Sequence, residues 1–214
     1  MNWSTVLLIA ELIGTAAFAL SGAMAGIDRK LDIFGVLVLA ACTALGGGTI
    51  RDVLLGYFPP RMFYSFTYLG VVAVVAIALF ILRVKIIPGK IENESLNSRL
   101  FVICDAVGLG IFSVVGTEAC LTAGYGDNPF MAVFLGVITG VGGGIMRDVM
   151  CVQIPGVLRK HIYAVASMAG SLCYYIMRQV LQTDPVFATI FCTALVTLLR
   201  TMAAHFRWNL PRPE

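Results

Sequence analysis

The sequence predicts an all-α polytopic membrane protein with seven transmembrane helices, arranged as two inverted three-helix repeats plus one further helix. Three observations lead to this fold class. Of the 214 residues, 59% are apolar and 13% are charged, against about a quarter charged in soluble domains. The mean hydropathy is +0.90. Apolar runs of about 20 residues, long enough to cross a bilayer, recur along the chain, and a phrase containing three glycines occurs twice.

The apolar runs are separated by polar residues, glycine or proline, which mark the connections. The most polar stretch, Pro88 to Arg99, is expected to be a loop near the midpoint of the chain. We therefore expect a first three-helix repeat (1–90), a second, inverted repeat (97–182), and a seventh helix with a cytoplasmic tail (183–214). The runs cover about residues 4–24, 33–55, 63–86, 100–123, 129–151, 161–181 and 185–205.

The chain carries an internal repeat. A shift of 96 residues places the phrase GGGTIRD, which begins at Gly46, on GGGIMRD, which begins at Gly142. A shift of 94 residues places Glu11 on another acid, Asp105. Because each copy holds three spans, an odd number, the second copy must enter the bilayer from the opposite side, as in the inverted repeats of transporters. The match also argues against a cleavable signal peptide, since the first apolar run corresponds to an internal one.

The distribution of basic residues predicts the orientation. Only Arg61 and Arg178 fall in connections on one side of the expected membrane, and the other side has many more. By the positive-inside rule, the N-terminus lies outside and the C-terminus lies in the cytoplasm. The cytoplasmic set comprises Arg29, Lys30, Arg83, Lys85, Lys90, Arg99, Arg159, Lys160, Arg200, Arg207 and Arg212.

Three successive glycines inside an apolar run allow two interpretations. One is close helix packing, because Gly136, Gly140 and Gly144 recur at every fourth position, the spacing of small residues at helix contacts. Packing alone leaves a triplet unexplained, since only one residue in four faces a given neighbour. We therefore expect helices 2 and 5 to be kinked at the triplets, with carbonyl groups facing an ion path. The triplets are Gly46, Gly47 and Gly48, and Gly142, Gly143 and Gly144.

An Arg-Asp pair follows each triplet within a turn: Arg51 and Asp52 in the first copy, Arg147 and Asp148 in the second. Adjacent residues on a helix point about 100° apart, so the members of a pair are not expected to bind each other. The pseudo-twofold symmetry suggests crossed partners instead, Arg51 with Asp148 or Arg147 with Asp52. Such charge pairs would either take part in gating or anchor the helix ends near the membrane interface.

Acidic residues within the expected spans suggest a path for cations. Glu11, Asp105 and Glu118 lie in spans one and four, where a carboxylate is costly unless it is paired or hydrated. Hydroxyl groups could line the same path, although Ser and Thr in helices often bond to a carbonyl of their own helix. The hydroxyl candidates are Ser21, Thr43, Thr117 and Thr139, with Thr15 and Ser113 as further ones.

Several other classes of protein are disfavoured by the sequence. It has no H-E-x-x-H or G-x-S-x-G motif and no histidine near the repeated phrases, so we do not expect an enzyme. The six cysteines form no C-x-x-C pair and are expected to act as small apolar residues, so we expect no metal site and no cofactor. The net charge of +3 does not indicate a nucleic-acid partner.

With spans arranged as three plus three plus one, and with GGGTIRD and GGGIMRD in spans two and five, the sequence resembles the trimeric intracellular cation channel (TRIC) family. The resemblance covers most of the chain, from Val6 to His205. The paired phrases are similar to those of the prokaryotic branch, whose members are also described as glycine transporters. The resemblance implies a prokaryotic inner-membrane homotrimer, with a pore through the six repeated helices of each protomer, an accessory seventh helix and lipids bound between protomers.

The function implied by this resemblance is a channel for monovalent cations, chiefly potassium, and the buried carboxylates agree with it. The alternative is a secondary transporter for a small amino acid such as glycine, in which half-helix N-termini after the glycines would face the substrate carboxylate. Both use the same architecture. The animal channels carry basic residues in a pore helix linked to voltage gating, but span four has no Lys or Arg after Arg99. We therefore do not expect their type of voltage control.

Overall fold

The computed structural model describes residues 3–83, 94–159, 162–206 and 208, and within these ranges it contains helices and no strand. The boundary expected after residue 90 lies outside the described residues. Three short helical segments lie between the main helices: η1 (Arg61–Tyr64), α6 (Gly156–Arg159) and η3 (Ile176–Val180). The main helices are α1 (Trp3–Asp28), α2 (Ile33–Leu54), α3 (Phe66–Ile81), α4 (Glu94–Thr122), α5 (Pro129–Met150), α7 (Ile162–Tyr175) and α8 (Pro185–His205).

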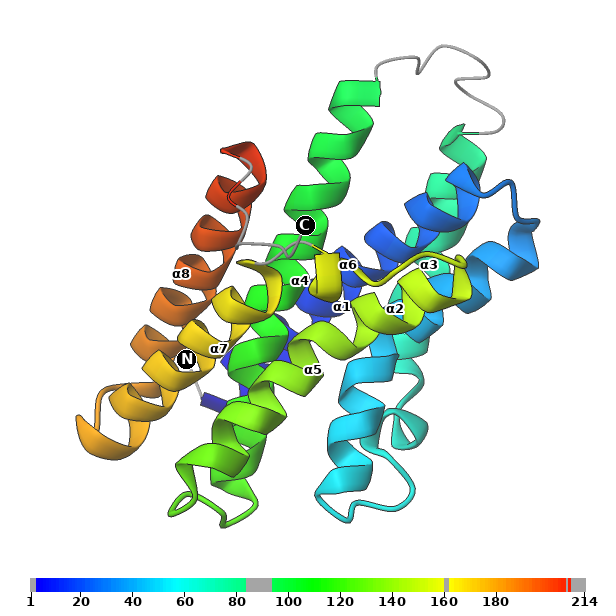
Figure 1. Cartoon of the computed structure of the whole chain (residues 1–214). Helices are drawn as coiled ribbons and strands as arrows, with labels where there is room; N and C mark the ends of the chain where they lie inside the picture. Colours follow the sequence, from blue (N-terminus) through cyan, green and yellow to red (C-terminus); the bar gives the residue numbers. More distant parts are fainter. Residues whose placement is uncertain (1–2, 84–93, 160–161, 207, 209–214) are drawn as a thin grey trace.

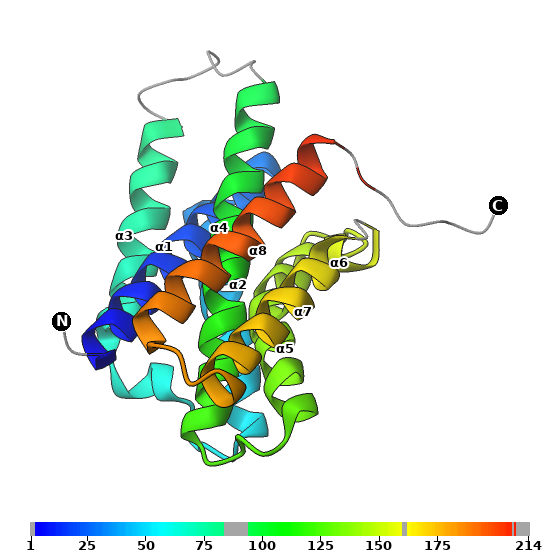
Figure 2. The same cartoon turned by 90° about the vertical axis from the view of Figure 1, so that its left-hand side faces the viewer.

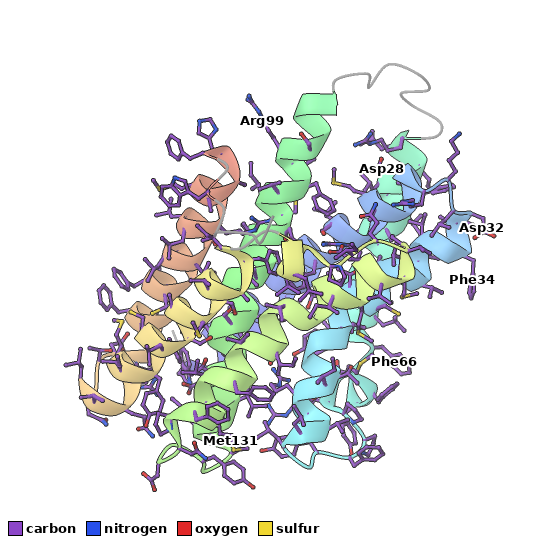
Figure 3. All side chains as sticks on the ribbon, in the orientation of Figure 1. Asp28, Asp32, Phe34, Phe66, Arg99 and Met131 are labelled. Carbon is purple, nitrogen blue, oxygen red and sulfur yellow. The ribbon has the colours of Figure 1, made fainter. Side chains whose placement is uncertain are left out.

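The structure is that of an all-helical membrane protein. Five helices (α1, α2, α4, α5 and α8) are long and apolar enough to cross a membrane, and α3 is a shorter apolar helix. A helix covers most of each of the seven expected runs, although the number of crossings stays a prediction for α3 and α7. The expected loop from Pro88 to Arg99 is wrong for its second half, because α4 already begins at Glu94 and its polar first turns continue the helix beyond the apolar run. Large apolar side chains cover the outside of the bundle, among them Phe34 and Phe66, which are 71% and 87% exposed (Figure 3). A lipid or protein environment must cover such a surface.

The helices of the two copies begin in the same way. Asp32 caps α2 by accepting a hydrogen bond from the Gly35 amide at 2.7 Å, and Asn128, 96 residues later, caps α5 by accepting one from the Met131 amide at 3.0 Å. Each side chain satisfies one of the free amide groups at a helix start. Matching positions of the two copies therefore begin matching helices.

The centre of the bundle is the crossing of α2 with α5, visible in Figure 1, where two backbones touch. A Cβ atom on Gly47 would overlap the carbonyl oxygen of Thr139, and a Cβ atom on Gly143 would overlap the carbonyl oxygen of Thr43. Glycine at both positions permits this approach, as at other close contacts between membrane helices. The crossing relates the two copies symmetrically.

The neighbouring glycines of each triplet face other groups. A Cβ atom on Gly46 would meet the sulfur of Met146, and one on Gly144 would lie 2.8 Å from the hydroxyl of Tyr163. A Cβ atom on Gly48 would have open space, with Arg51 Nη2 at 3.8 Å. Close packing therefore accounts for successive glycines whose missing side chains face different neighbours, but it leaves Gly48 unexplained. Both helices also stay α-helical through their triplets, so neither is interrupted there.

A second pair of close contacts repeats between the copies. A Cβ atom on Gly22 of α1 would lie 2.6 Å from Thr43 Oγ1 on α2, and one on Gly116 of α4 would lie 2.5 Å from Thr139 Oγ1 on α5. Each copy thus packs its first helix against its second through a glycine and a threonine. The same threonines offer their carbonyl oxygens to the central crossing, so α1, α2, α4 and α5 form one continuous packing unit.

We predict that Gly47→Ala destabilises the fold and that Gly48→Ala does not. The added methyl at residue 47 would overlap a backbone oxygen that cannot rotate away, and overpacking of this kind costs about 1–3 kcal/mol or more. The methyl at residue 48 meets open space, and alanine favours a helix over glycine by about 1 kcal/mol. Thermal unfolding of the detergent-purified protein, followed by size-exclusion chromatography, compares the two variants.

Gly143→Ala should match Gly47→Ala, because it meets the corresponding oxygen of Thr43. Equal melting temperatures for the variants at residues 47 and 48 would contradict the central role of the crossing.

Candidate functional site

Two cavities lie in the interior, each beside one Arg-Asp pair. The first cavity has a volume of about 260 Å³ and is bounded by α1, α2, η1, α3 and one residue of α4. The second cavity has a volume of about 490 Å³ and is bounded by α4, α5, α7, α8 and the segment before α6. The charged and phenolic residues of the first are Glu11, Arg51, Asp52, Arg61 and Tyr68, and those of the second are Asp105, Arg147, Asp148, Tyr163 and Arg200.

The two cavities lie toward opposite ends of the bundle. The first lies beside η1 and the beginning of α3, and the second lies beside the beginning of α4. Figure 2 shows the end of α3 and the beginning of α4 together at the top, and the cyan segment that precedes α3 at the bottom. The end with the beginning of α4 also carries Asp28 and Arg99, which are labelled at the top of Figure 3. The cavities share no lining residue.

In the first cavity, the Arg-Asp pair binds itself and the following loop. Arg51 donates to Asp52 Oδ1 from Nε at 2.9 Å and from Nη2 at 2.7 Å. The other oxygen of Asp52 accepts from the backbone amide of Arg61 at 2.9 Å. Across the cavity, the hydroxyl of Tyr68 donates to Glu11 Oε2 at 2.5 Å. The pair therefore fixes the end of α2 to the loop that leads into α3.

In the second cavity, Arg147 binds two carboxylates. It donates to Asp148 Oδ1 from Nε at 2.9 Å and to Asp105 Oδ1 from Nη1 at 2.6 Å. The same Nη1 also donates to the hydroxyl of Ser21 on α1. The second oxygen of Asp148 accepts from the Gly156 amide at 2.7 Å, the counterpart of the loop contact in the first cavity. Arg147 thus joins α1, α4 and α5 through charged hydrogen bonds, which are among the stronger ones in proteins.

The crossed pairing expected from symmetry is wrong. Arg51 and Arg147 each bind the aspartate that directly follows them, and Arg147 adds Asp105 rather than Asp52. The angle of about 100° between adjacent residues separates their Cβ atoms. It does not prevent contact here because the long arginine side chain folds back along the helix end to its neighbour.

Most of the remaining predicted site residues lie apart from the cavities. Glu118 accepts from the hydroxyl of Tyr174 at 3.0 Å and from Nε of Arg178 at 3.4 Å, and it lines neither cavity. Four of the expected hydroxyls donate to a carbonyl of their own helix, four residues earlier, as helical Ser and Thr often do. These four are Thr43, Thr117, Thr139 and Ser113, and none of them lines either cavity.

Of the six glycines in the two triplets, only Gly48 lines one of these two cavities, namely the first. Gly46, Gly47, Gly142, Gly143 and Gly144 line neither, and their contacts are with neighbouring helices. Thr15 lines the first cavity while donating to the Glu11 carbonyl at 2.7 Å. The structure therefore brings the carboxylates and arginines of each copy together, and it places the triplets at the crossing between them.

An aromatic pair lies at the centre, and sequence reasoning missed it. The rings of Phe18 on α1 and Phe112 on α4 have centroids 5.3 Å apart and are related by the shift of 94 residues. Phe112 also lines the first cavity, and a Cβ atom on Gly143 would lie 3.4 Å from the ring of Phe18. The two phenylalanines therefore lie between the first cavity and the α2–α5 crossing. Their match under the repeat was the signal available in the sequence.

Sequence reasoning also missed three polar residues of the cavities. Tyr68 and Tyr163 begin corresponding helices, 95 residues apart, and each lines the cavity of its own copy. Arg200 was expected among the cytoplasmic loop cations, but it is only 4% exposed and lines the second cavity. This correction follows from its position, since residue 200 lies within the seventh apolar run rather than after it. Within the described residues, no group of acids, cysteines and histidines could hold a metal ion.

The fold and these cavities define a class: a polytopic α-helical membrane protein whose interior carries buried carboxylate and arginine groups on both sides of a central helix crossing. Comparison with known proteins gives the family. The sequence model of the family described as Glycine transporter matches residues 8–84 and 102–179. The chain belongs to this family, and the resemblance drawn from its two GGG-Arg-Asp motifs is confirmed.

Curated relatives and solved structures agree with this assignment. The UPF0126 inner membrane protein YadS of Escherichia coli strain K12 is 40% identical over 207 residues, which cover 95% of this chain and 93% of that protein. A UPF0126 membrane protein of Vibrio cholerae is 36% identical over 212 residues, which cover 98% of this chain and 83% of that protein. The relatives are thus membrane proteins of similar length.

Two solved structures are similar over nearly the whole chain. The TRIC trimeric intracellular cation channel orthologue from Rhodobacter sphaeroides has a TM-score of 0.84 and 30% identity, with 95% of this chain and 100% of that chain covered. A prokaryotic TRIC channel in 0.5 M KCl has a TM-score of 0.85 and 33% identity, with 97% and 100% covered. Both similarities include the helices that form the two cavities.

We predict strong energetic coupling between Arg147 and Asp105 and none between Arg51 and Asp148. Loss of one partner of a buried ion pair leaves the other charge uncompensated, which costs about 3–5 kcal/mol, and the loss is smaller when both are removed. A double-mutant cycle with Arg147→Met and Asp105→Asn should give a coupling of more than about 1 kcal/mol. Chemical unfolding in detergent micelles measures each stability.

The matched cycle uses Arg51→Met and Asp148→Asn, which share no contact in the structure and should be additive. If Arg147→Met fails to accumulate, Arg147→Lys provides a milder first mutation. Coupling in the Arg51 cycle, without coupling in the Arg147 cycle, would restore the crossed arrangement.

Proposed function

We propose that this protein is a passive channel for monovalent cations, chiefly potassium, with one pore in each protomer of a homotrimer. The proposal rests on the two charged cavities, which lie toward opposite ends of the bundle with the α2–α5 crossing between them. The solved structures with this fold are TRIC cation channels, one of them described as trimeric. The exposed apolar surface provides the area that contacts between protomers and with lipids require.

Carboxylates in the cavities favour cations over anions. Glu11 and Asp52 line the first cavity, and Asp105 and Asp148 line the second. Of these four, Glu11 has a neutral partner, the Tyr68 hydroxyl, whereas the others are bound by arginine or by backbone amides as well. Its negative charge is thus available to a hydrated cation, as in the acidic rings of cation channels. Glu11 is the residue on which we expect selectivity to depend most.

The pathway between the cavities passes the glycine crossing and the phenylalanine pair. The rings of Phe18 and Phe112 are 1% and 7% exposed, so the described state is closed at this level. A constriction lined by apolar side chains excludes water and ions until it widens. Bending of α2 and α5 at their triplets would widen it, and the change of direction along α2 in Figure 1 supports a bend in that helix. The kinks and the path through them belong to this proposal.

The proposed orientation keeps the N-terminus outside and the C-terminus in the cytoplasm. The first cavity then faces outward, and the second faces the cytoplasm. The connections at the second cavity's end, which include Arg29 and Lys30, carry the basic residues that the positive-inside rule requires. We retain seven crossings in an inner membrane, with 1–90 and 97–182 as inverted repeats, and residues 183–214 as the seventh helix and tail.

A secondary transporter for a small amino acid such as glycine remains the second candidate, and one observation favours it. The second cavity is lined by the carboxylates of Asp105 and Asp148 and by the guanidinium of Arg200. Arg200 forms no ion pair within the described part of the chain. Opposite charges in one cavity suit a zwitterion, which carries an ammonium and a carboxylate. The description of the matching family agrees with this candidate.

We predict that the purified protein, fused into a planar bilayer in potassium salt, gives unitary current steps with a cation-selective reversal potential. Glu11→Gln should lower the cation-to-anion permeability ratio severalfold, because it removes a charge that has only a neutral partner. The glutamine can still accept the hydrogen bond from Tyr68, so the fold should be retained. Reversal potentials under a potassium chloride gradient measure the ratio.

Asp127→Asn is the control, because this acid is exposed and lines neither cavity. A silent bilayer, with liposomes from the same preparation accumulating labelled glycine to saturation, would refute the channel and support the transporter. Gly47→Ala cannot serve as a control for permeation, because its effect on packing would mask any effect on current.

A further inference from the structure

Helix α8 brings an arginine into the second cavity without a partner for its charge. Arg200 is 4% exposed, and its Nε atom is buried and donates no hydrogen bond in the described part of the chain. Its guanidinium lies over the ring of Tyr163, with Cζ 4.8 Å from the ring centroid. A cation–π contact of this kind offsets only part of the cost of removing a charge from water. The remaining cost calls for an anionic partner.

The nearby carboxylates do not fill this role. Asp105 and Asp148 are both bound by Arg147, at 2.6 Å and 2.8 Å, and neither forms an ion pair with Arg200. The buried Nε of Arg200 therefore has no acceptor among the described residues. Because arginine keeps its proton at any physiological pH, the side chain cannot escape the cost by becoming neutral.

A second donor in the same cavity lacks a well-formed partner among the described residues. The hydroxyl of Tyr163 is buried and makes no hydrogen bond of good geometry there, although Asp105 is close enough for a weak one. A phenol can donate one hydrogen bond, and a guanidinium can donate a parallel pair to two oxygens of one group. Two adjacent donors that both need an oxygen acceptor match a carboxylate or a phosphate. The cavity volume of about 490 Å³ lies in the range of small-ligand sites.

The first cavity makes a useful comparison. Its additional arginine, Arg61, also stacks on a tyrosine, with Cζ 4.5 Å from the centroid of Tyr57. Arg61 is exposed, so water satisfies its donors, whereas Arg200 is buried. Of the two cavities, therefore, only the second contains a buried arginine with an unsatisfied donor. This residue, Arg200, belongs to α8, the helix outside the repeat.

We propose that the second cavity is a binding site for an oxyanion, a carboxylate or phosphate group, held by Arg200 of α8. The group comes either from a free small anion or from the headgroup of an anionic lipid. The site assigns a ligand-binding role to α8, which packs mainly against α4 and α7. It does not depend on the channel proposal, because binding is measured without a membrane potential or a current.

The test uses the full chain, purified in a neutral detergent and freed of anionic lipid. Isothermal titration calorimetry with inorganic phosphate measures the affinity, and a second titration uses dihexanoyl phosphatidic acid, a short-chain anionic lipid. We expect saturable binding to the wild type and at least a tenfold weaker affinity for Arg200→Gln. Arg200→Lys should give an intermediate affinity, since it keeps the charge but loses the two-pronged donor. Arg61→Gln, the matched control, should bind within twofold of the wild type.

Thermal unfolding separates binding from a structural role. A ligand that binds only the folded state raises its melting temperature. Phosphate or the short-chain lipid should therefore raise the melting temperature of the wild type and of Arg61→Gln, but not that of Arg200→Gln.

Binding of phosphate would identify a free anion as the source, and binding of the lipid alone would identify a headgroup. The proposal is overturned if neither probe binds the wild type, or if Arg200→Gln binds as tightly as the wild type does. If Arg200→Gln does not fold, an Arg200→Lys affinity equal to that of the wild type overturns it.

Discussion

The contact on which the rest of the structure depends is the crossing of α2 and α5, where backbone meets backbone. At Gly47 and Gly143 there is no room for a side chain, because the carbonyl oxygens of Thr139 and Thr43 occupy the space. Helices that approach this closely gain dispersion contacts along both backbones, which is the main attraction available between helices in lipid. The same approach leaves the ends of α2 and α5 apart, and the two cavities form at those ends.

Charge is distributed around this crossing in two similar clusters. In each copy the aspartate after the triplet holds the arginine before it and a backbone amide of the next loop. Arg147 extends its cluster to Asp105 and to Ser21 of the other copy, so the two halves are joined by charge as well as by packing. These interactions remove most of the cost of burying the charges. The Arg-Asp motif therefore stabilises the fold as well as lining the cavities.

Helix α8 breaks the symmetry of the two halves. It packs against α4 and α7, both in the second copy, and contributes Arg200 to the second cavity. The two cavities therefore differ in chemistry although their repeated residues match. The first contains Glu11, which has a neutral partner, and the second contains Arg200, whose buried Nε has no partner among the described residues. Because the two cavities differ in chemistry, they can bind different chemical groups, even if one pathway connects them.

The helical membrane fold and the repeat could be predicted from the sequence, because hydropathy and motif spacing are properties of short segments of the chain. The repeat also placed Glu11 and Asp105 at equivalent positions. The start of α4, the carboxylate that each arginine binds and the burial of Arg200 could be seen only in the folded structure. These outcomes depend on how far a long side chain reaches and on which helix faces pack together. Both are determined by contacts between residues that are far apart in the sequence.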